Sequence, residues 1–168
     1  QVGEFMATQL PTSLTWKDVE NYRKLWKRPL VLKGVMRVDD AKRAADLGVD
    51  GLIISNHGAR QLDRAPSALD VLPAINAAVG DRMTLMLDGG IRRGSDLLVA
   101  LGSGAKFVFM GRPTLYGVVA GGEPGAVKAT QIMRDEINKI MAQVGCPTLR
   151  ECGPDFLHWD QDGRNARP

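Results

Sequence analysis

Short apolar runs alternate along this chain with segments in which apolar residues recur at helical spacing. Four runs have the length and composition of buried β-strands, at 29–33, 51–55, 83–88 and 106–110. Helical spacing is found at about 16–26, 39–47, 67–79, 95–101, 114–120 and 123–144. This alternation predicts an α/β fold in which parallel strands are joined by right-handed helical crossovers.

Local signals place several element boundaries. Thr15 and Asp18 have the spacing of a capping box at the start of the first helix, and Ser95 is expected to cap the helix after the third strand. Gly145 is expected to end the last helix. The run 30–32, Leu-Val-Leu, is typical of a strand that is buried on both faces.

Each apolar run ends in glycines and in charged or hydrogen-bonding residues. The four ends are Lys33-Gly34, Asn56-His57-Gly58-Ala59-Arg60, Asp88-Gly89-Gly90-Ile91-Arg92 and Gly111-Arg112. This pattern favours part of a (β/α)₈ barrel. The competing architecture is a doubly wound open sheet, but no Gly-x-Gly-x-x-Gly follows the first strand. A whole barrel needs about 250 residues. We therefore expect half a barrel, whose open edges pack on another half.

Composition and charge narrow the class of protein. The chain has 168 residues, 44% of them hydrophobic, and a net charge of +3, which is typical of a soluble globular domain. Its basic residues are spread out, so we expect no nucleic-acid partner. No apolar run approaches the roughly 18 residues of a membrane span. The start has neither an initiator Met nor a signal-peptide pattern, so we expect it to be internal to a longer sequence.

Three regions follow from these patterns: a loop or linker at 1–14, the half-barrel at 15–157, and a flexible polar tail at 158–168. Cys146 and Cys152 are expected to be reduced thiols, and two cysteines alone make no metal site. His57 has no suitably spaced second ligand either, so no metal is expected.

The last two strand ends have the features of a phosphate site. Glycines let backbone N–H groups approach an anion, a helix N-terminus adds partial positive charge, and Arg92 and Arg112 can chelate phosphate oxygens. The plainer interpretation is turn glycines beside solvated arginines. Two such turns in succession, at the barrel position most used for phosphate, favour the phosphate site.

The first two strand ends bring potential cations together. His57 follows a buried strand, Arg60 comes three residues later, and Lys33 ends the neighbouring strand. These groups repel one another unless an anion binds, so they suit an anionic substrate that loses a proton to the imidazole. His57 could instead be structural, and His158 in the polar tail is expected to be incidental. Lys33 fits either a Schiff-base lysine or a fixed charge beside a cofactor.

The segment from Ser55 to Asp63, with Leu32-Lys33-Gly34, Asp88–Gly94 and Gly111-Arg112-Pro113, closely resembles the FMN-dependent L-2-hydroxy acid oxidase/dehydrogenase family. That family includes glycolate oxidase, lactate oxidase and mandelate dehydrogenase, and the similarity covers roughly residues 5–157. It implies the C-terminal half (strands 5–8) of an FMN-binding TIM barrel plus a C-terminal helix. It also implies oxidation of a lactate- or mandelate-like L-2-hydroxy acid to the 2-oxo acid, with reduced FMN reoxidised by oxygen or another acceptor.

The resemblance implies a role for each matched residue. His57 is the active-site base, and Arg60 grips the substrate carboxylate. Lys33 lies beside the flavin N1/C2=O edge and stabilises the anionic reduced flavin, which argues against a Schiff base. The other matched residues bind the cofactor: Ser55 contacts the flavin ring, and Asp88, Gly89, Gly90, Arg92, Gly111 and Arg112 hold the ribityl chain and phosphate.

The resemblance also implies partners. These are the N-terminal half of the same barrel, as a separate segment or chain, and further copies in a homotetramer, in the cytoplasm with peroxisomal or membrane-associated locations left open. That half supplies the family's histidine-orienting carboxylate and substrate tyrosines. Two other classes stay open: another phosphate-binding TIM-barrel enzyme, such as a nucleotide-handling isomerase or reductase, and a non-catalytic half-barrel assembly subunit.

Overall fold

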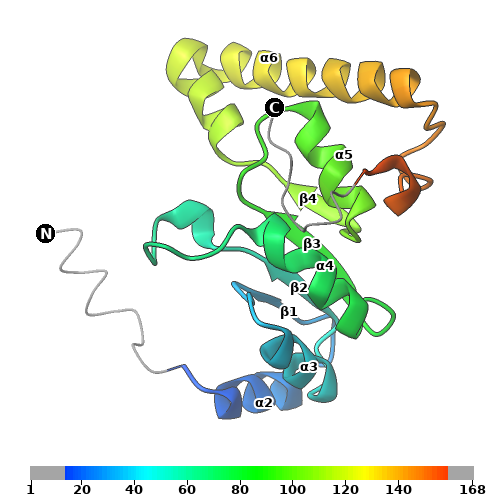
Figure 1. The fold of residues 1–168 in the computed structure, drawn as a ribbon. Coiled ribbons are helices and arrows are strands. Elements are labelled where there is room, and N and C mark those ends of the chain that lie inside the picture. The colour runs from blue at the N-terminus through cyan, green and yellow to red at the C-terminus, as the bar shows by residue number, and fades with distance from the viewer. Residues whose placement is uncertain (1–13, 159–168) are drawn as a thin grey trace, which may run out of the picture.

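The computed structural model describes residues 14–158, so nearly all of the expected linker at 1–14 and tail at 158–168 lies outside the described residues. Four strands form one parallel sheet in the order β1-β2-β3-β4 (Figure 1). They are β1 (Val31–Lys33), β2 (Gly51–Ile54), β3 (Thr84–Asp88) and β4 (Phe107–Phe109). The predicted parallel order is confirmed, and each strand is one or two residues shorter than predicted.

Helices alternate with these strands as predicted. They are α2 (Trp16–Leu25), α3 (Val38–Asp46), α4 (Ala68–Val79), α5 (Gly94–Gly102) and α6 (Arg112–Val144), with short 3₁₀ turns η1 (His57–Ala59) and η2 (Pro154–Phe156). The backbone of α6 is non-helical at Gly121 and Gly122, which matches the two helices predicted at 114–120 and 123–144. None of the described helices is long and apolar enough to cross a membrane.

The hydrophobic core lies between one face of the sheet and the crossover helices. Alternate residues of β2 and β3 point to this face, and right-handed crossovers place α3, α4 and α5 over it. The almost inaccessible side chains are Ala41, Ala44, Leu52, Ile54, Leu72, Ile75, Val79, Leu85, Leu87 and Ala100. Burial of these side chains holds the strand ends of the sheet in fixed positions.

The opposite face of the sheet is exposed. The register aligns Lys33, Ile53, Met86 and Phe107 in one row across the four strands. Phe107 is 56% exposed in this row. The expectation that the first strand is buried on both faces is wrong for this structure, since Val31 is 40% exposed. The reason is that β1 is an edge strand of the described sheet, and the crossover helices cover the opposite face of the sheet from Val31.

One predicted helix start is confirmed and another is wrong. At α2, the Asp18 carboxylate accepts hydrogen bonds from the backbone N–H and the hydroxyl of Thr15, both at 2.7 Å. The hydroxyl contact is the main cause that lowers the pKa of Asp18. Ser95 does not cap α5, because the helix begins earlier and its N-cap is Arg93. The Asp96 carboxylate accepts the Arg93 N–H at 2.9 Å instead.

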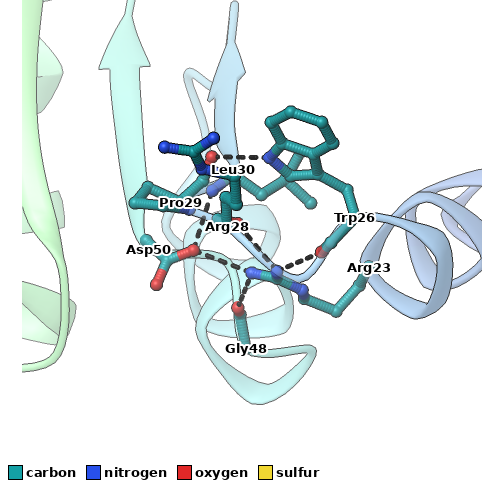
Figure 2. A network of polar contacts seen from close by, with 7 residues as sticks. All are labelled: Arg23, Trp26, Arg28, Pro29, Leu30, Gly48 and Asp50. Atoms are coloured by element: carbon teal, nitrogen blue, oxygen red, sulfur yellow. Dashed lines mark hydrogen bonds and ion pairs between the residues drawn. The ribbon is translucent and has the colours of Figure 1, made fainter.

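Arg23 ties the end of α2 to the amino ends of two strands (Figure 2). Its guanidinium donates to the Asp50 carboxylate at 2.8 Å and to the carbonyl oxygens of Gly48 at 3.2 Å and Arg28 at 2.8 Å. Asp50 also accepts the Leu30 N–H at 2.8 Å. That bond, followed by the contact with Arg23, lowers the pKa of Asp50. Leu30 and Asp50 directly precede β1 and β2, so this network lies opposite the strands' carboxyl ends.

Helices α5 and α6 meet at a close backbone approach. The Glu136 carboxylate on α6 accepts the Gly94 N–H at 2.8 Å and pairs with the Arg93 guanidinium at 2.7 Å. A Cβ atom added at Gly94 would lie 2.6 Å from the backbone nitrogen of Ile137 and 2.7 Å from Cβ of Glu136. Only glycine therefore fits at this first position of α5.

The variant Gly94→Ala is expected to lower the free energy of unfolding by about 1–3 kcal/mol, because the added methyl group forces α5 and α6 apart. Urea denaturation followed by circular dichroism measures this loss. Gly153→Ala is the matched control, since its backbone is extended, with φ −129° and ψ −175°, and the nearest atom to an added Cβ is 3.8 Å away. Equal urea midpoints for Gly94→Ala and the parent would contradict the packing described here.

The contacts of Glu136 also predict a pH dependence of stability. The Gly94 N–H, and after it Arg93, lower the pKa of Glu136 from its ordinary value of 4.5. The ionised carboxylate therefore stabilises the fold fully well above pH 4.5, and this contribution is lost as the pH falls through the lower folded pKa. Thermal melts of Glu136→Gln should show a lower Tm than the parent at pH 7 and a smaller further loss on acidification. A parallel pH dependence for both proteins would refute this.

Candidate active site

The carboxyl ends of the four parallel strands meet at one edge of the sheet, around a cavity of about 360 Å³. All the predicted site residues except Ser55 line it, namely Lys33, His57, Arg60, Asp88, Gly89, Gly90, Arg92, Gly111 and Arg112. Ser55 is 3% exposed and lies directly behind this lining, in contact with Lys33 and Asp88. The structure thus brings together residues that are up to 79 positions apart in the sequence.

Lys33 is paired with a carboxylate. Its Nζ atom lies 3.0 Å from the Asp88 carboxylate and 3.1 Å from the Ser55 Oγ atom. The Ser55 hydroxyl donates a hydrogen bond to Asp88 in turn. The sequence led us to expect three mutually repelling cationic groups at this mouth, and Asp88 offsets the charge of one of them. Among residues 14–158, no ion pair is found for Arg60, Arg92 or Arg112, so all three guanidinium groups of the cavity are available to anionic ligands.

The loop that carries His57 and Arg60 has a strained backbone. His57, Ala59 and Arg64 have φ angles of 55°, 60° and 58°, and they are the non-glycine residues with positive φ in the described part of the chain. Each such residue costs on the order of 1–3 kcal/mol and persists only where its surroundings hold it. The His57 N–H is held by the Ser55 Oγ atom at 3.0 Å.

Asn56 is a residue of this loop that sequence reasoning missed. Its side-chain amide donates to the carbonyl oxygen of Pro66 at 3.1 Å and so joins the two ends of the loop. Its Oδ1 atom lies 3.3 Å from where a Cβ of Gly89 would be, so the loop lies close to the end of the next strand. The only signal in the sequence was its position between Ser55 and His57.

Sequence reasoning also missed the apolar part of the cavity lining, which consists of Ile91, Phe109, Met110 and Leu115. Apolar residues at a strand end resemble core residues in a sequence, so no local signal separates them. The cavity is therefore lined by both apolar and cationic side chains. Such a mixture suits a ligand that has an apolar or aromatic part and one or more anionic groups.

The two glycine turns differ in whether the N–H groups at the start of the following helix are free to bind an anion. At α5, the carboxylates of Asp96 and Glu136 already accept the N–H groups of Arg92, Arg93 and Gly94. At α6 the N-cap is Gly111, which offers no side-chain cap, and a Cβ there would meet nothing within 4 Å. The expected contribution of a helix N-terminus to anion binding therefore fits α6 and not α5.

The described residues offer fewer groups for binding a metal cation than for binding an anion. Within the described residues no group of three His, Cys, Asp or Glu side chains is placed to hold a metal ion. Cys146 and Cys152 are free thiols, and burial is the main cause that raises the pKa of Cys152. Fold and cavity together define part of a parallel β/α barrel with a cavity, lined by cationic side chains, at the carboxyl ends of its strands.

Comparison with known proteins names the family. A family model described as FMN-dependent dehydrogenase matches residues 1–159. L-lactate oxidase of Nostoc sp. is 46% identical over 154 residues, which are 92% of this chain and 42% of that protein. Pre-mycofactocin synthase of Mycobacterium tuberculosis is 46% identical over 152 residues, which are 90% of this chain and 38% of that protein. This chain belongs to the FMN-dependent 2-hydroxy acid dehydrogenase family, as its sequence motifs predicted.

Solved structures agree with the fold. The structure of (S)-mandelate dehydrogenase superposes with a TM-score of 0.87 at 40% identity, covering 93% of this chain and 41% of that one. Flavocytochrome b2 with sulfite bound gives a TM-score of 0.84 at 43% identity, covering 89% and 40%. The four parallel strands and their helices match part of the TIM barrel of these proteins, which confirms the predicted fold class. The chain spans about two-fifths of the length of the relatives it matches.

Proposed function

We propose that this chain is the C-terminal half, strands 5–8, of an FMN-dependent enzyme that oxidises a lactate- or mandelate-like L-2-hydroxy acid to the 2-oxo acid. The supporting observation is that one cavity is lined both by Lys33, His57 and Arg60 and by Arg92 and Arg112. The first group suits the carboxylate and the reacting carbon of a hydroxy acid, and the second suits a phosphate.

The residues of the cavity fit FMN. Gly89 and Gly90 have φ angles of 98° and 79°, and a Cβ at Gly90 or Gly111 would meet nothing within 4 Å, so the backbone is open to a phosphate or ribityl oxygen. Arg92, Arg112 and the first turn of α6 would hold the phosphate. Lys33 would face the flavin ring, and Asp88 the ribityl chain. When bound, FMN accepts the two electrons that the hydroxy acid loses.

Three side chains of this chain would bind the substrate, accept its proton and stabilise negative charge. The Arg60 guanidinium binds the substrate carboxylate through two parallel hydrogen bonds, which fixes the α-carbon relative to His57. The His57 imidazole accepts a proton from the substrate and holds it as the 2-oxo acid forms. Lys33, held by Asp88 at 3.0 Å, keeps a positive charge where negative charge accumulates on reduction.

We propose that the N-terminal half of the same barrel covers the exposed face of the sheet. Phe107 and Phe109 on that face are 56% and 40% exposed, and their rings contact each other at a centroid distance of 5.0 Å. Both β1 and β4 are open edge strands among the described residues, and a closed barrel removes such edges. We further propose a homotetramer in the cytoplasm, as the resemblance of the sequence to the family implies. We call this chain assembled with that half the completed barrel.

Anaerobic spectroscopy of the completed barrel tests the function. We expect the flavin absorbance near 450 nm, typical of oxidised flavins, and its bleaching when L-lactate or (S)-mandelate is added. A flavoprotein that neither acid bleaches would refute the proposed reaction. A colourless protein would refute the cofactor as well and would favour another phosphate-binding barrel enzyme or an assembly subunit.

A further inference from the structure

The side chain of Arg92 borders open space at two places. Arg92 is exposed and lines the cavity at the strand ends. It also lines a second, smaller cavity of about 190 Å³, whose other lining residues are Pro113, Ala129, Ile132, Met133 and Glu136. Among residues 14–158 no ion pair is found for its guanidinium. The direction of this side chain therefore depends on how firmly its backbone is held.

Two carboxylates hold the backbone of this turn. The Oδ2 atom of Asp96 accepts the N–H groups of Arg92 at 2.8 Å and of Arg93 at 2.9 Å. Glu136 accepts the Gly94 N–H at 2.8 Å and pairs with the Arg93 guanidinium at 2.7 Å. Three successive N–H groups are thus bound by two side chains, one from α5 itself and one from the neighbouring helix α6.

The charge of these two residues is informative. Negative groups beside a phosphate site repel the phosphate, and Asp96 and Glu136 also occupy N–H groups that could otherwise bind it. Charge alone therefore disfavours carboxylates at this position. Their contribution is a fixed backbone, because an arginine that is already held in place loses less conformational freedom when it binds a ligand.

We propose that Asp96 and Glu136 are positioning residues that fix the backbone of Arg92 and so direct its guanidinium to the phosphate of the cofactor. The proposal rests on the proposed function, in which Arg92 holds that phosphate. It predicts that loss of either carboxylate weakens the binding of FMN but not of riboflavin, which has the same ring and ribityl chain without the phosphate. An effect of charge alone would tighten FMN binding, and an effect on stability alone would not distinguish the two flavins.

The test measures the dissociation constants of FMN and of riboflavin for the flavin-free completed barrel. Flavin is titrated with the protein, and binding is followed by the change in flavin fluorescence. The parent is compared with Asp96→Ala, Asp96→Glu and Glu136→Gln. Crystal structures of the same flavin-free variants show the position of the Arg92 guanidinium.

The chain offers a matched control for each carboxylate. Asp18 matches Asp96, because it is also the third residue of its helix and accepts a backbone N–H at the start of that helix. Asp50 matches Glu136, because it accepts a backbone N–H at 2.8 Å and pairs with an arginine at 2.8 Å. Neither control residue lines the cavity, so Asp18→Ala and Asp50→Asn should bind both flavins as the parent does.

We expect Asp96→Ala and Glu136→Gln each to raise the Kd of FMN about tenfold, roughly the contribution of one hydrogen bond to a charged group. The Kd of riboflavin should not change. Asp96→Glu keeps a carboxylate of the kind usual in a capping box, so it should lie between Asp96→Ala and the parent. In the crystal structures of Asp96→Ala and Glu136→Gln, the Arg92 guanidinium should leave the position it has in the parent.

FMN binding as tight as that of the parent, or tighter, in Asp96→Ala and Glu136→Gln would overturn the proposal, and so would an equal loss for FMN and riboflavin. If Asp96→Ala does not fold, Glu136→Gln decides by the same comparison. If the parent binds neither flavin, the proposed function fails, and the position of the Arg92 guanidinium in the variant crystals still decides whether the two carboxylates hold it.

Discussion

Replacing His57 by glutamine is expected to slow flavin reduction by about 10²–10⁴-fold, the usual contribution of a general base. Glutamine has nearly the same size and keeps hydrogen-bonding groups, but it cannot accept a proton at neutral pH. The cavity and the phosphate-binding turns are unchanged, so the variant should still bind FMN. Slow reduction together with retained FMN indicates a chemical role for His57, whereas loss of FMN would indicate a structural one.

Anaerobic stopped-flow spectroscopy of the completed barrel measures this rate directly. The chain offers a matched control in His158→Gln, because His158 is the second of its two histidines and is exposed outside the cavity. That variant should reduce its flavin at the parental rate. Near-normal reduction in His57→Gln would remove His57 from the mechanism, while loss of FMN would show that it belongs to the cofactor site.

Arg60→Met should lower kcat/KM by about 30-fold or more. A hydrogen bond to a charged group contributes about 1.5–3 kcal/mol, and every 1.4 kcal/mol is a factor of ten. Methionine retains much of the side-chain length and removes the guanidinium, so the substrate carboxylate is left unpaired. The loss should fall on both substrate binding and orientation, because one contact supplies both.

Two further variants give this experiment its controls. Arg60→Lys keeps the charge without the planar pair of donors and should lie between the parent and Arg60→Met. Arg64→Met removes a charge from the same loop at an exposed residue that does not line the cavity, and it should leave kcat/KM unchanged. An unchanged kcat/KM in Arg60→Met would show that the carboxylate is bound elsewhere.

The order of the strands could be predicted from the sequence because the signals that mark each strand are local. Apolar runs such as Leu52–Ile54 and the polar residues after them lie within a few positions of one another, and parallel pairing then brings the strand ends together. For the same reason Lys33, His57 and Asp88 were predicted near one cavity before any contact between them was known.

The contacts within the site were not predictable in this way. Nothing in the sequence shows that Asp88 pairs with Lys33 or that the Ser55 hydroxyl joins them to His57, because these bonds depend on side-chain directions in the folded chain. The predicted start of α5 was wrong for a related reason. The N–H of Gly94, the first residue of the helix, donates to Glu136, which lies 42 residues further along the chain. The exposure of Val31 was not predictable either, because it depends on which elements pack against the edge strand β1.

The separation of the Arg23–Asp50 network from the cavity has a practical consequence for engineering. The two lie at opposite ends of strands such as β2, whose four residues span about 13 Å. That distance exceeds the Debye length of about 8 Å at physiological salt, so charges at one end barely influence the other. Thermostabilising substitutions around Arg23 and substrate-specificity substitutions around Arg60 can therefore be screened in separate libraries and combined afterwards with additive effects.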